Sequence, residues 1–185
     1  AALFWFAVPR ALPLDDAWIH QVVARTFAES VTLGYAAGDH GAAATSYLWA
    51  ALLAVNFAWV HVGPVRWAFA LNVALALATA QLLFALLART SSARGAISGL
   101  AFAATLLACT SANILWFAHS GMEVCLFLAL SLTAVWAATA RATDVRFTLL
   151  AGAAGALTAL ARPEGAPLCG LLLAYVVWRR RATPH

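Results

Sequence analysis

Apolar residues occur in long blocks along this chain, and the length of these blocks predicts helices. The clearest block is 65–88, in which Arg66, Asn72 and Gln81 are the only strongly polar residues. A helix needs about 20 mostly apolar residues to cross a bilayer, so this block predicts a membrane span. Further apolar blocks predict membrane helices over 96–118, 122–140, 147–161 and 166–178.

Two apolar blocks near the beginning of the chain are too short to assign by length. Residues 1–14 read as the end of a truncated span, and we expect the chain to be the front part of a longer membrane protein. Residues 47–62 carry Tyr47, Trp49 and Trp59, and such aromatic residues are typical of the membrane–water interface. This second block is therefore predicted either to cross the membrane or to lie on it.

Between these blocks, residues 17–29 predict an amphipathic helix. Trp18 and Val22 share an apolar face at helical spacing, whereas His20 and Gln21 fall on the polar face. We expect this helix to lie along a membrane surface or to pack on the spans.

Composition supports a membrane protein. The chain is 64% hydrophobic and 10% charged, whereas about a quarter of the residues of soluble domains are charged. Its eleven basic residues are all arginines, and they are spread among short connections. This spread argues against nucleic-acid binding, which requires a clustered basic patch. The predicted fold class is an all-α polytopic transmembrane bundle.

The arginines also predict which side faces the cytoplasm. If 65–88 is one span followed by two helical hairpins, most arginines share one face, which the positive-inside rule makes cytoplasmic. The hairpin tips at 117–123 and 162–165 then lie outside. The arginines on the predicted cytoplasmic face are Arg89, Arg94, Arg141, Arg146 and residues 179–181.

Asp15 and Asp16 are adjacent carboxylates at the start of the amphipathic helix, in a chain with seven acidic residues. A helix N-cap explains one of them, because aspartate is favoured there. Two adjacent carboxylates repel each other, and together they suit a divalent cation or a catalytic base. The residues alone leave both interpretations open.

The two hairpin tips offer further polar groups. Ser120 and Glu123 of "SGME" match a capping box at a helix start, and Glu123 and His119 are alternatively able to reach a polar ligand. In "RPEG" the residues after Arg162 are ordinary helix-start signals. Arg162 itself lies close to the predicted hydrocarbon boundary, where ionisable residues tend to be functional, and its donors suit a phosphate.

The order of four short segments, "DDAWI", "ATSYLW", "HSGME" and "ARPEG", resembles the membrane half of GT-C glycosyltransferases. The similar enzymes use polyprenyl-phosphate sugars and include mycobacterial arabinofuranosyltransferases and dolichyl-phosphate-mannose-dependent mannosyltransferases. Their usual pattern is "DDAYI", "TSPLW" or "SNPLW", "SGLET" and "TRPEG". This chain departs from it at "SYLW", at "SGMEV" and at residues 42–44, where alanines replace an expected acidic residue.

The resemblance implies roles for particular residues. Asp15 would be the catalytic base, and Asp16 would hold the acceptor or a divalent ion (Mg²⁺, Mn²⁺ or Ca²⁺) together with Asp15; no organic cofactor is implied. It also places residues 15–62 in an extracytoplasmic loop whose helices, including 47–62, lie on the membrane. Arg162 would lie near the donor phosphate. The remaining residues implied in substrate binding are Glu123, His119, Thr45 and Ser46.

The predicted activity is transfer of a sugar from a polyprenyl-phosphate donor to a hydroxyl of a glycan, lipid or protein, with inversion. It would take place on the extracytoplasmic face of a bacterial plasma membrane. The alternatives are a transporter or ion-coupled carrier with the Asp pair as a cation or proton site, and a non-catalytic homologue. Transporter sites usually lie near the bilayer midplane, whereas these acidic residues lie at span ends, which favours the enzyme.

Overall fold

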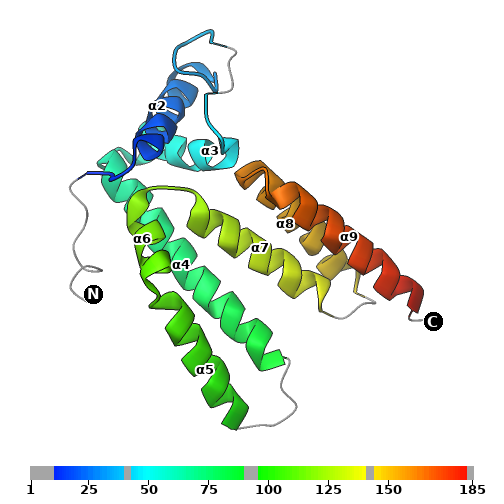
Figure 1. The fold of residues 1–185 in the computed structure, drawn as a ribbon. Coiled ribbons are helices and arrows are strands. Elements are labelled where there is room, and N and C mark those ends of the chain that lie inside the picture. Colours follow the sequence, from blue (N-terminus) through cyan, green and yellow to red (C-terminus); the bar gives the residue numbers. More distant parts are fainter. Residues whose placement is uncertain (1–10, 40–42, 90–95, 141–143, 183–185) are drawn as a thin grey trace. The chain divides into compact units, whose positions relative to one another are not determined.

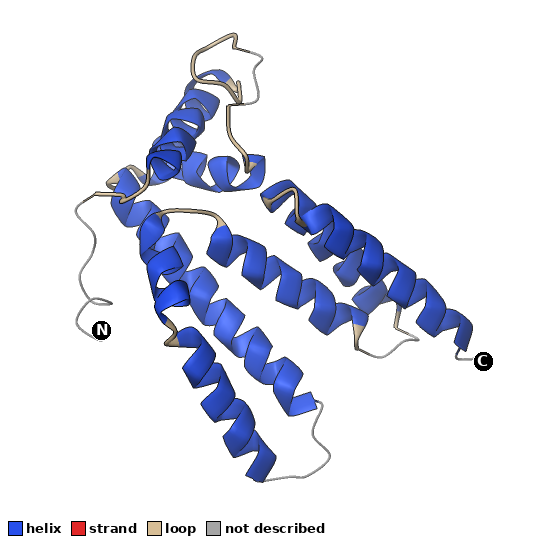
Figure 2. Ribbon diagram, viewed as in Figure 1, coloured by secondary structure: helices blue, strands red, loops and turns tan. Residues whose placement is uncertain are grey.

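The computed structural model describes residues 11–39, 43–89, 96–140 and 144–182. These residues form helices joined by loops, with no strand among them (Figure 2). The prediction of an all-helical chain is therefore confirmed. Most of 1–14, predicted as the end of a span, lies outside the described residues.

The chain divides into two compact units. Unit 1 comprises Ala1–Ala76 and Thr110–Leu126, and unit 2 comprises Leu77–Cys109 and Phe127–His185. Helix α4 (Pro64–Arg89) begins in unit 1 and ends in unit 2. The two units are described separately below.

Unit 1 is built around α2 (Asp15–Ser30) and α3 (Tyr47–Val55), which pack against each other (Figure 1). It also contains the first half of α4 and all of α6 (Ala112–Ser120). The amphipathic helix predicted over 17–29 is confirmed as α2, which begins two residues earlier. One buried apolar cluster of unit 1 contains Val23, Ala44 and Ala50.

The apolar block at 47–62 continues from α3 into a π-helical turn, η1 (Asn56–Val60). Buried Asn56 closes this turn, because its Nδ2 donates to the Val62 carbonyl at 2.9 Å and its Oδ1 accepts from the Val62 N–H at 3.0 Å. The helix ends at His61, which has a φ of 60°. Tyr47–Val60 is too short to count as a membrane span.

Unit 2 contains the second half of α4, most of α7, and all of α5, α8 and α9. Helices α8 and α9 lie side by side (Figure 1). The end of α7 packs on both of them through Ala137 and Ala138, which contact Ala151 of α8 and Tyr175 of α9. The helix bounds are Ala96–Cys109 for α5, Val124–Ala138 for α7, Val145–Ala161 for α8 and Gly165–Ala182 for α9.

The prediction of one continuous helix over 96–118 is wrong, because the chain breaks between α5 and α6. Ser111 is the N-cap of α6, and its hydroxyl accepts from the Ile114 N–H at 3.5 Å. A serine hydroxyl offers the backbone an alternative to the helical hydrogen bond, which explains a break at this position. The helices predicted over 122–140, 147–161 and 166–178 are present with shifted ends.

Of the described helices, α4 alone is long and apolar enough to cross a membrane, and α5 with α6 would be a second if that broken pair were one span. Only 17% of the apolar window of α4 is buried. Large apolar side chains are also exposed on other helices, among them Leu107, Leu149 and Leu171. Apolar helices with exposed faces are typical of contact with lipid, and the polytopic bundle stays a prediction.

Two of the arginines predicted on one face of the membrane, Arg89 and Arg179, line one pocket of unit 2. Arg94 and Arg141 lie outside the described residues. The identity of that face as cytoplasmic stays a prediction.

Candidate functional site

Asp15 and Asp16 form the first turn of α2, and both are exposed. The N-cap of the helix is Leu14, and no side chain caps this end. The interpretation of one aspartate as an N-cap is therefore wrong. The positions of both carboxylates in the first turn are still favourable, because the N-terminal end of the helix dipole attracts negative charge.

The buried face of α2 differs in part from the predicted apolar face. Trp18 and Val22, predicted on the apolar face, are 42% and 46% exposed. His20 and Gln21, predicted on the polar face, are buried because they have partners inside unit 1: Glu123 for His20, and the Pro64 carbonyl for Gln21. The buried residues of the helix are Ala17, His20, Gln21, Val23 and Ala24.

His20 connects the aspartate turn to the "SGME" tip. Its Nδ1 lies 2.9 Å from the backbone carbonyl of Asp16, one helical turn earlier. Its Nε2 lies 4.0 Å from Oε2 of Glu123, which is within ion-pair range but beyond hydrogen-bond range. Both side chains are 1% exposed. A buried pair of titratable groups therefore contacts the backbone of the turn that carries the exposed carboxylates.

The hydrogen bond to Asp16 fixes the tautomer of His20. A carbonyl oxygen only accepts hydrogen bonds, so Nδ1 must carry the hydrogen. Nε2 therefore carries a proton only when the ring is an imidazolium, and it makes no hydrogen bond within the described residues.

The "SGME" tip is anchored to unit 1 by its glycine. Trp49, which is fully buried in α3, donates from Nε1 to the Gly121 carbonyl at 2.9 Å. Gly121 has a φ of 77°, and a Cβ atom at this position would lie 2.5 Å from Cδ2 of Leu12 and 3.3 Å from the Ala17 side chain. The segments before and after the aspartate pair thus pack directly on the tip.

The predicted capping box at "SGME" is wrong. Ser120 ends α6 and does not begin the next helix, which starts at Val124. Its hydroxyl donates to the Phe117 carbonyl at 2.9 Å and accepts from the Met122 N–H at 3.2 Å. Ser120 therefore shapes the turn, and Glu123 reaches His20.

The other residues implied in substrate binding have varied surroundings. His119 is buried, lies 2.9 Å from the Leu115 carbonyl through Nδ1, and has its ring centroid 5.1 Å from that of Phe69. Ser46 is buried and caps α3 by accepting from the Trp49 N–H at 3.2 Å. Thr45 is exposed. Ser46 therefore has a structural task, and Thr45 is accessible to a ligand.

Arg162 belongs to unit 2 and is described there by itself. It is the C-cap of α8, and its backbone N–H donates to the Thr158 carbonyl at 3.0 Å. Its Nε lies 3.6 Å from Oε2 of Glu164, and its side chain is 34% exposed. The site assembled in unit 1 thus comprises Asp15, Asp16, His20 and Glu123, without Arg162.

Asp15 and Asp16 are the side chains that would bind a divalent ion, so their number and type decide which ion suits them. No group of three or more His, Cys, Asp or Glu side chains suited to a metal occurs in the part of the chain that the structure describes. Two carboxylates fit an ion such as Mg²⁺, which commonly binds one or two carboxylates and completes its shell with water and substrate phosphates. When bound, such an ion would neutralise phosphate charge.

The opposite end of α2 carries an exposed ion pair. Nε of Arg25 donates to Oε1 of Glu29 at 2.8 Å. This hydrogen bond, and then the charge of Glu29, raise the pKa of Arg25 above its ordinary value. The two residues are four positions apart on the helix, and both side chains are exposed.

His20 and Trp49 are the two residues of the site whose importance the sequence reasoning missed. The spacing of Ala17, His20, Gln21 and Ala24 was a usable signal, because i, i+3, i+4 and i+7 define one helical face. Two alanines on that face allow close packing, which indicates burial of the polar residues between them. No local pattern pointed to the contact of Trp49 with the "SGME" tip.

The described part of the chain is thus all-helical, with one helix of membrane-span length and a buried polar pair that contacts the backbone of the turn carrying two exposed carboxylates. No protein-family model, no curated protein and no solved structure matches it. Its function is therefore argued from its own residues.

Proposed function

We propose that this chain is part of a membrane glycosyltransferase that transfers a sugar from a polyprenyl-phosphate donor to an acceptor hydroxyl. One observation carries the proposal. The "DDAWI" and "SGME" segments, about a hundred residues apart, meet in unit 1 through His20, Glu123 and Gly121. Both segments also belong to the GT-C resemblance.

The exposed carboxylates of Asp15 and Asp16 are suited to general-base chemistry. One of them takes the proton of the acceptor hydroxyl while the oxygen of that hydroxyl attacks the anomeric carbon of the donor. The bond from that carbon to the phosphate oxygen breaks, and its electron pair leaves with the phosphate. General-base catalysis contributes roughly 10²- to 10⁴-fold to such a reaction.

His20 and Glu123 are positioning residues in this proposal. The ring of His20 holds the backbone of Asp16 through its carbonyl, and Glu123 lies against the other side of the ring. Fixing a reactive carboxylate on a packed helix limits its freedom, and orientation of the reacting groups is a large part of catalysis. The role of Arg162 at the donor phosphate stays a prediction for a residue of unit 2.

The transporter alternative draws some support from the break between α5 and α6, because transporter sites often lie in broken helices. However, residues 96–120 contain no aspartate or glutamate. The acidic pair lies instead on α2, which is amphipathic and not a span. The placement of charge therefore supports the enzyme.

The test is transfer of radiolabelled sugar from polyprenyl-phosphate donors by membranes containing the full-length protein. We expect Asp15→Asn or Asp16→Asn to reduce transfer about 10²-fold or more. Glu29→Gln is the matched control, since it removes an exposed carboxylate from the other end of α2, and we expect its activity to equal that of the wild type.

Transfer that is unaffected by both aspartate substitutions would exclude this pair as the base. Equal losses in the Glu29→Gln control would show that the effect comes from the net charge of α2. Uptake of a labelled ion or solute that depends on the pair, with no sugar transfer, would favour the transporter.

A further inference from the structure

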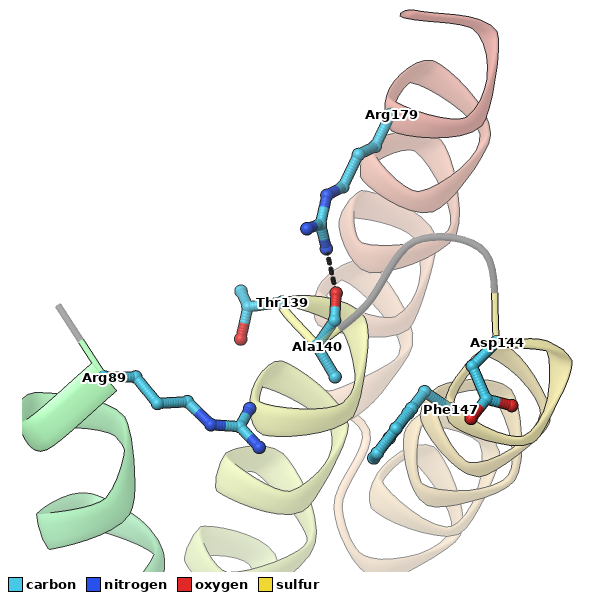
Figure 3. A pocket seen from close by; sticks show the side chains of 6 residues that line it. All are labelled: Arg89, Thr139, Ala140, Asp144, Phe147 and Arg179. Atoms are coloured by element: carbon cyan, nitrogen blue, oxygen red, sulfur yellow. Dashed lines mark hydrogen bonds between the residues drawn. The ribbon is translucent and has the colours of Figure 1, made fainter. Parts of the chain in front are cut away.

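Unit 2 contains a basic pocket that the proposed glycosyltransferase chemistry does not use. Its volume is about 540 Å³, within the range of pockets that hold small ligands. Figure 3 shows the side chains that line it. It lies where the end of α7 meets α4, α8 and α9. The lining residues among those described are Arg89, Thr139, Ala140, Asp144, Phe147 and Arg179.

The two arginines of the pocket are held in place by contacts with α7. Arg89 stacks on Trp136, with Cζ 4.2 Å from the ring centroid, and donates from Nη1 to the Trp136 carbonyl at 3.1 Å. Arg179 donates from Nη1 to the carbonyls of Ala138, at 3.1 Å, and Ala140 (Figure 3). These carbonyls form the negative end of the α7 dipole, and the arginines offset it.

The charge balance of the pocket is positive. Arg89 and Arg179 face a single acidic residue, Asp144, and no lysine or further carboxylate is among the described lining residues. The Oδ1 atom of Asp144 accepts from the Arg146 N–H at 2.9 Å as the N-cap of α8. A guanidinium presents five N–H donors on three nitrogen atoms in a planar fork. The hydrogen bond of Arg89 to the Trp136 carbonyl uses one of these nitrogen atoms, Nη1.

We propose that this pocket binds the phosphate group of an anionic ligand. Planar guanidinium groups match phosphate oxygens in charge and geometry. Basic pockets between membrane helices bind phosphate-bearing lipid headgroups, and free phosphate presents the same oxygens. The proposal rests on unit 2 alone, so it does not depend on the glycosyltransferase assignment.

The experiment measures the melting temperature, Tm, of the full chain in a neutral detergent during titration with three probes. A ligand that binds only the folded protein raises Tm with its concentration. Phosphatidylglycerol supplies an anionic phosphate headgroup, phosphatidylcholine a headgroup without net charge, and inorganic phosphate the free anion. We expect phosphatidylglycerol to raise Tm and phosphatidylcholine to leave it unchanged.

Three variants assign the effect to the pocket. We expect Arg89→Gln to weaken phosphatidylglycerol binding about tenfold or more, because it removes a charged donor. Arg146→Gln is the matched control: it changes the same charge on an exposed residue outside the pocket, and binding should be retained. Asp144→Asn keeps the N-cap but removes the negative charge, so binding should tighten about two- to fivefold.

The probes also separate the two sources of phosphate. A response to inorganic phosphate as well as to phosphatidylglycerol supports a site for the free anion, and a response to phosphatidylglycerol alone supports a lipid headgroup. Equal shifts with phosphatidylcholine, or equal binding by the wild type and Arg89→Gln, would overturn the proposal. If Arg89→Gln does not fold, unchanged or weaker binding by Asp144→Asn would overturn it.

Discussion

Unit 1 and unit 2 each contain a group of titratable side chains, but the surroundings of these side chains differ. In unit 1, His20 and Glu123 are 1% exposed and come from segments far apart in the chain. In unit 2, Arg89 is exposed, donates to the Trp136 carbonyl and lines a pocket.

This difference predicts a division of tasks. Breaking a buried charged pair leaves a group without compensation in a dry environment, so such a pair constrains the structure strongly. An exposed charge can exchange a protein partner for a ligand at little cost, because water screens it. The buried pair of unit 1 therefore positions other groups, whereas the exposed Arg89 of unit 2 suits the proposed binding of a ligand.

The largest effect on stability is expected for Glu123→Ala. Removing the carboxylate leaves the buried His20 ring opposite an empty space, and breaking a buried pair typically costs about 3–5 kcal/mol. We expect a matching loss in the free energy of unfolding, measured by denaturation in a neutral detergent.

A double-mutant cycle with His20→Leu separates this pair from simple loss of packing. If the two residues act as a pair, the double variant loses less stability than the sum of the single variants. Strict additivity would contradict the contact between His20 and Glu123.

An intermediate effect is expected for Trp49→Phe. The substitution removes the Nε1 donor and leaves the Gly121 carbonyl without this hydrogen bond in a buried position, which costs about 1–3 kcal/mol. The same denaturation measurement tests it. Trp59→Phe is the control, because Trp59 is 77% exposed, and surface substitutions usually change stability by less than about 0.5 kcal/mol. Equal losses in the two variants would argue against the Trp49 anchor.

The smallest effect is expected for Arg25→Gln. Its ion pair with Glu29 has both side chains more than 60% exposed, and such pairs contribute little. We expect Tm to remain at the wild-type value at low and at high salt. A drop in Tm at low salt that disappears at high salt would show that even the exposed charges of α2 stabilise unit 1.

The helices were largely predictable because apolar length and helical periodicity are local properties. The pattern gave α2, α4, α8 and α9 with ends shifted by a few residues. The break before α6 was missed, although Ser111 is a favoured N-cap type. The break was missed because a single serine changes the apolar character of the block 96–118 very little.

The candidate site was less predictable because its contacts join distant segments. Asp15, Asp16 and Glu123 were chosen for their chemistry and by resemblance, but nothing near them in the sequence showed that His20 lies between the two motifs. The burial of His20 depends on Glu123, a residue of another helical segment. His20 was therefore predicted on the polar face of α2 because it is polar, whereas its contact with Glu123 places it on the buried face.

The turn closed by Asn56 has a consequence for the order in which unit 1 folds. Its two side-chain hydrogen bonds span six residues, whereas the bond from Trp49 to Gly121 spans 72. Closing a short loop takes roughly 10–100 ns and loses less chain entropy than closing a long one. The turn between η1 and α4 can thus form during synthesis, before the "SGME" tip has been made. The tip then packs on a part of unit 1 that is already folded.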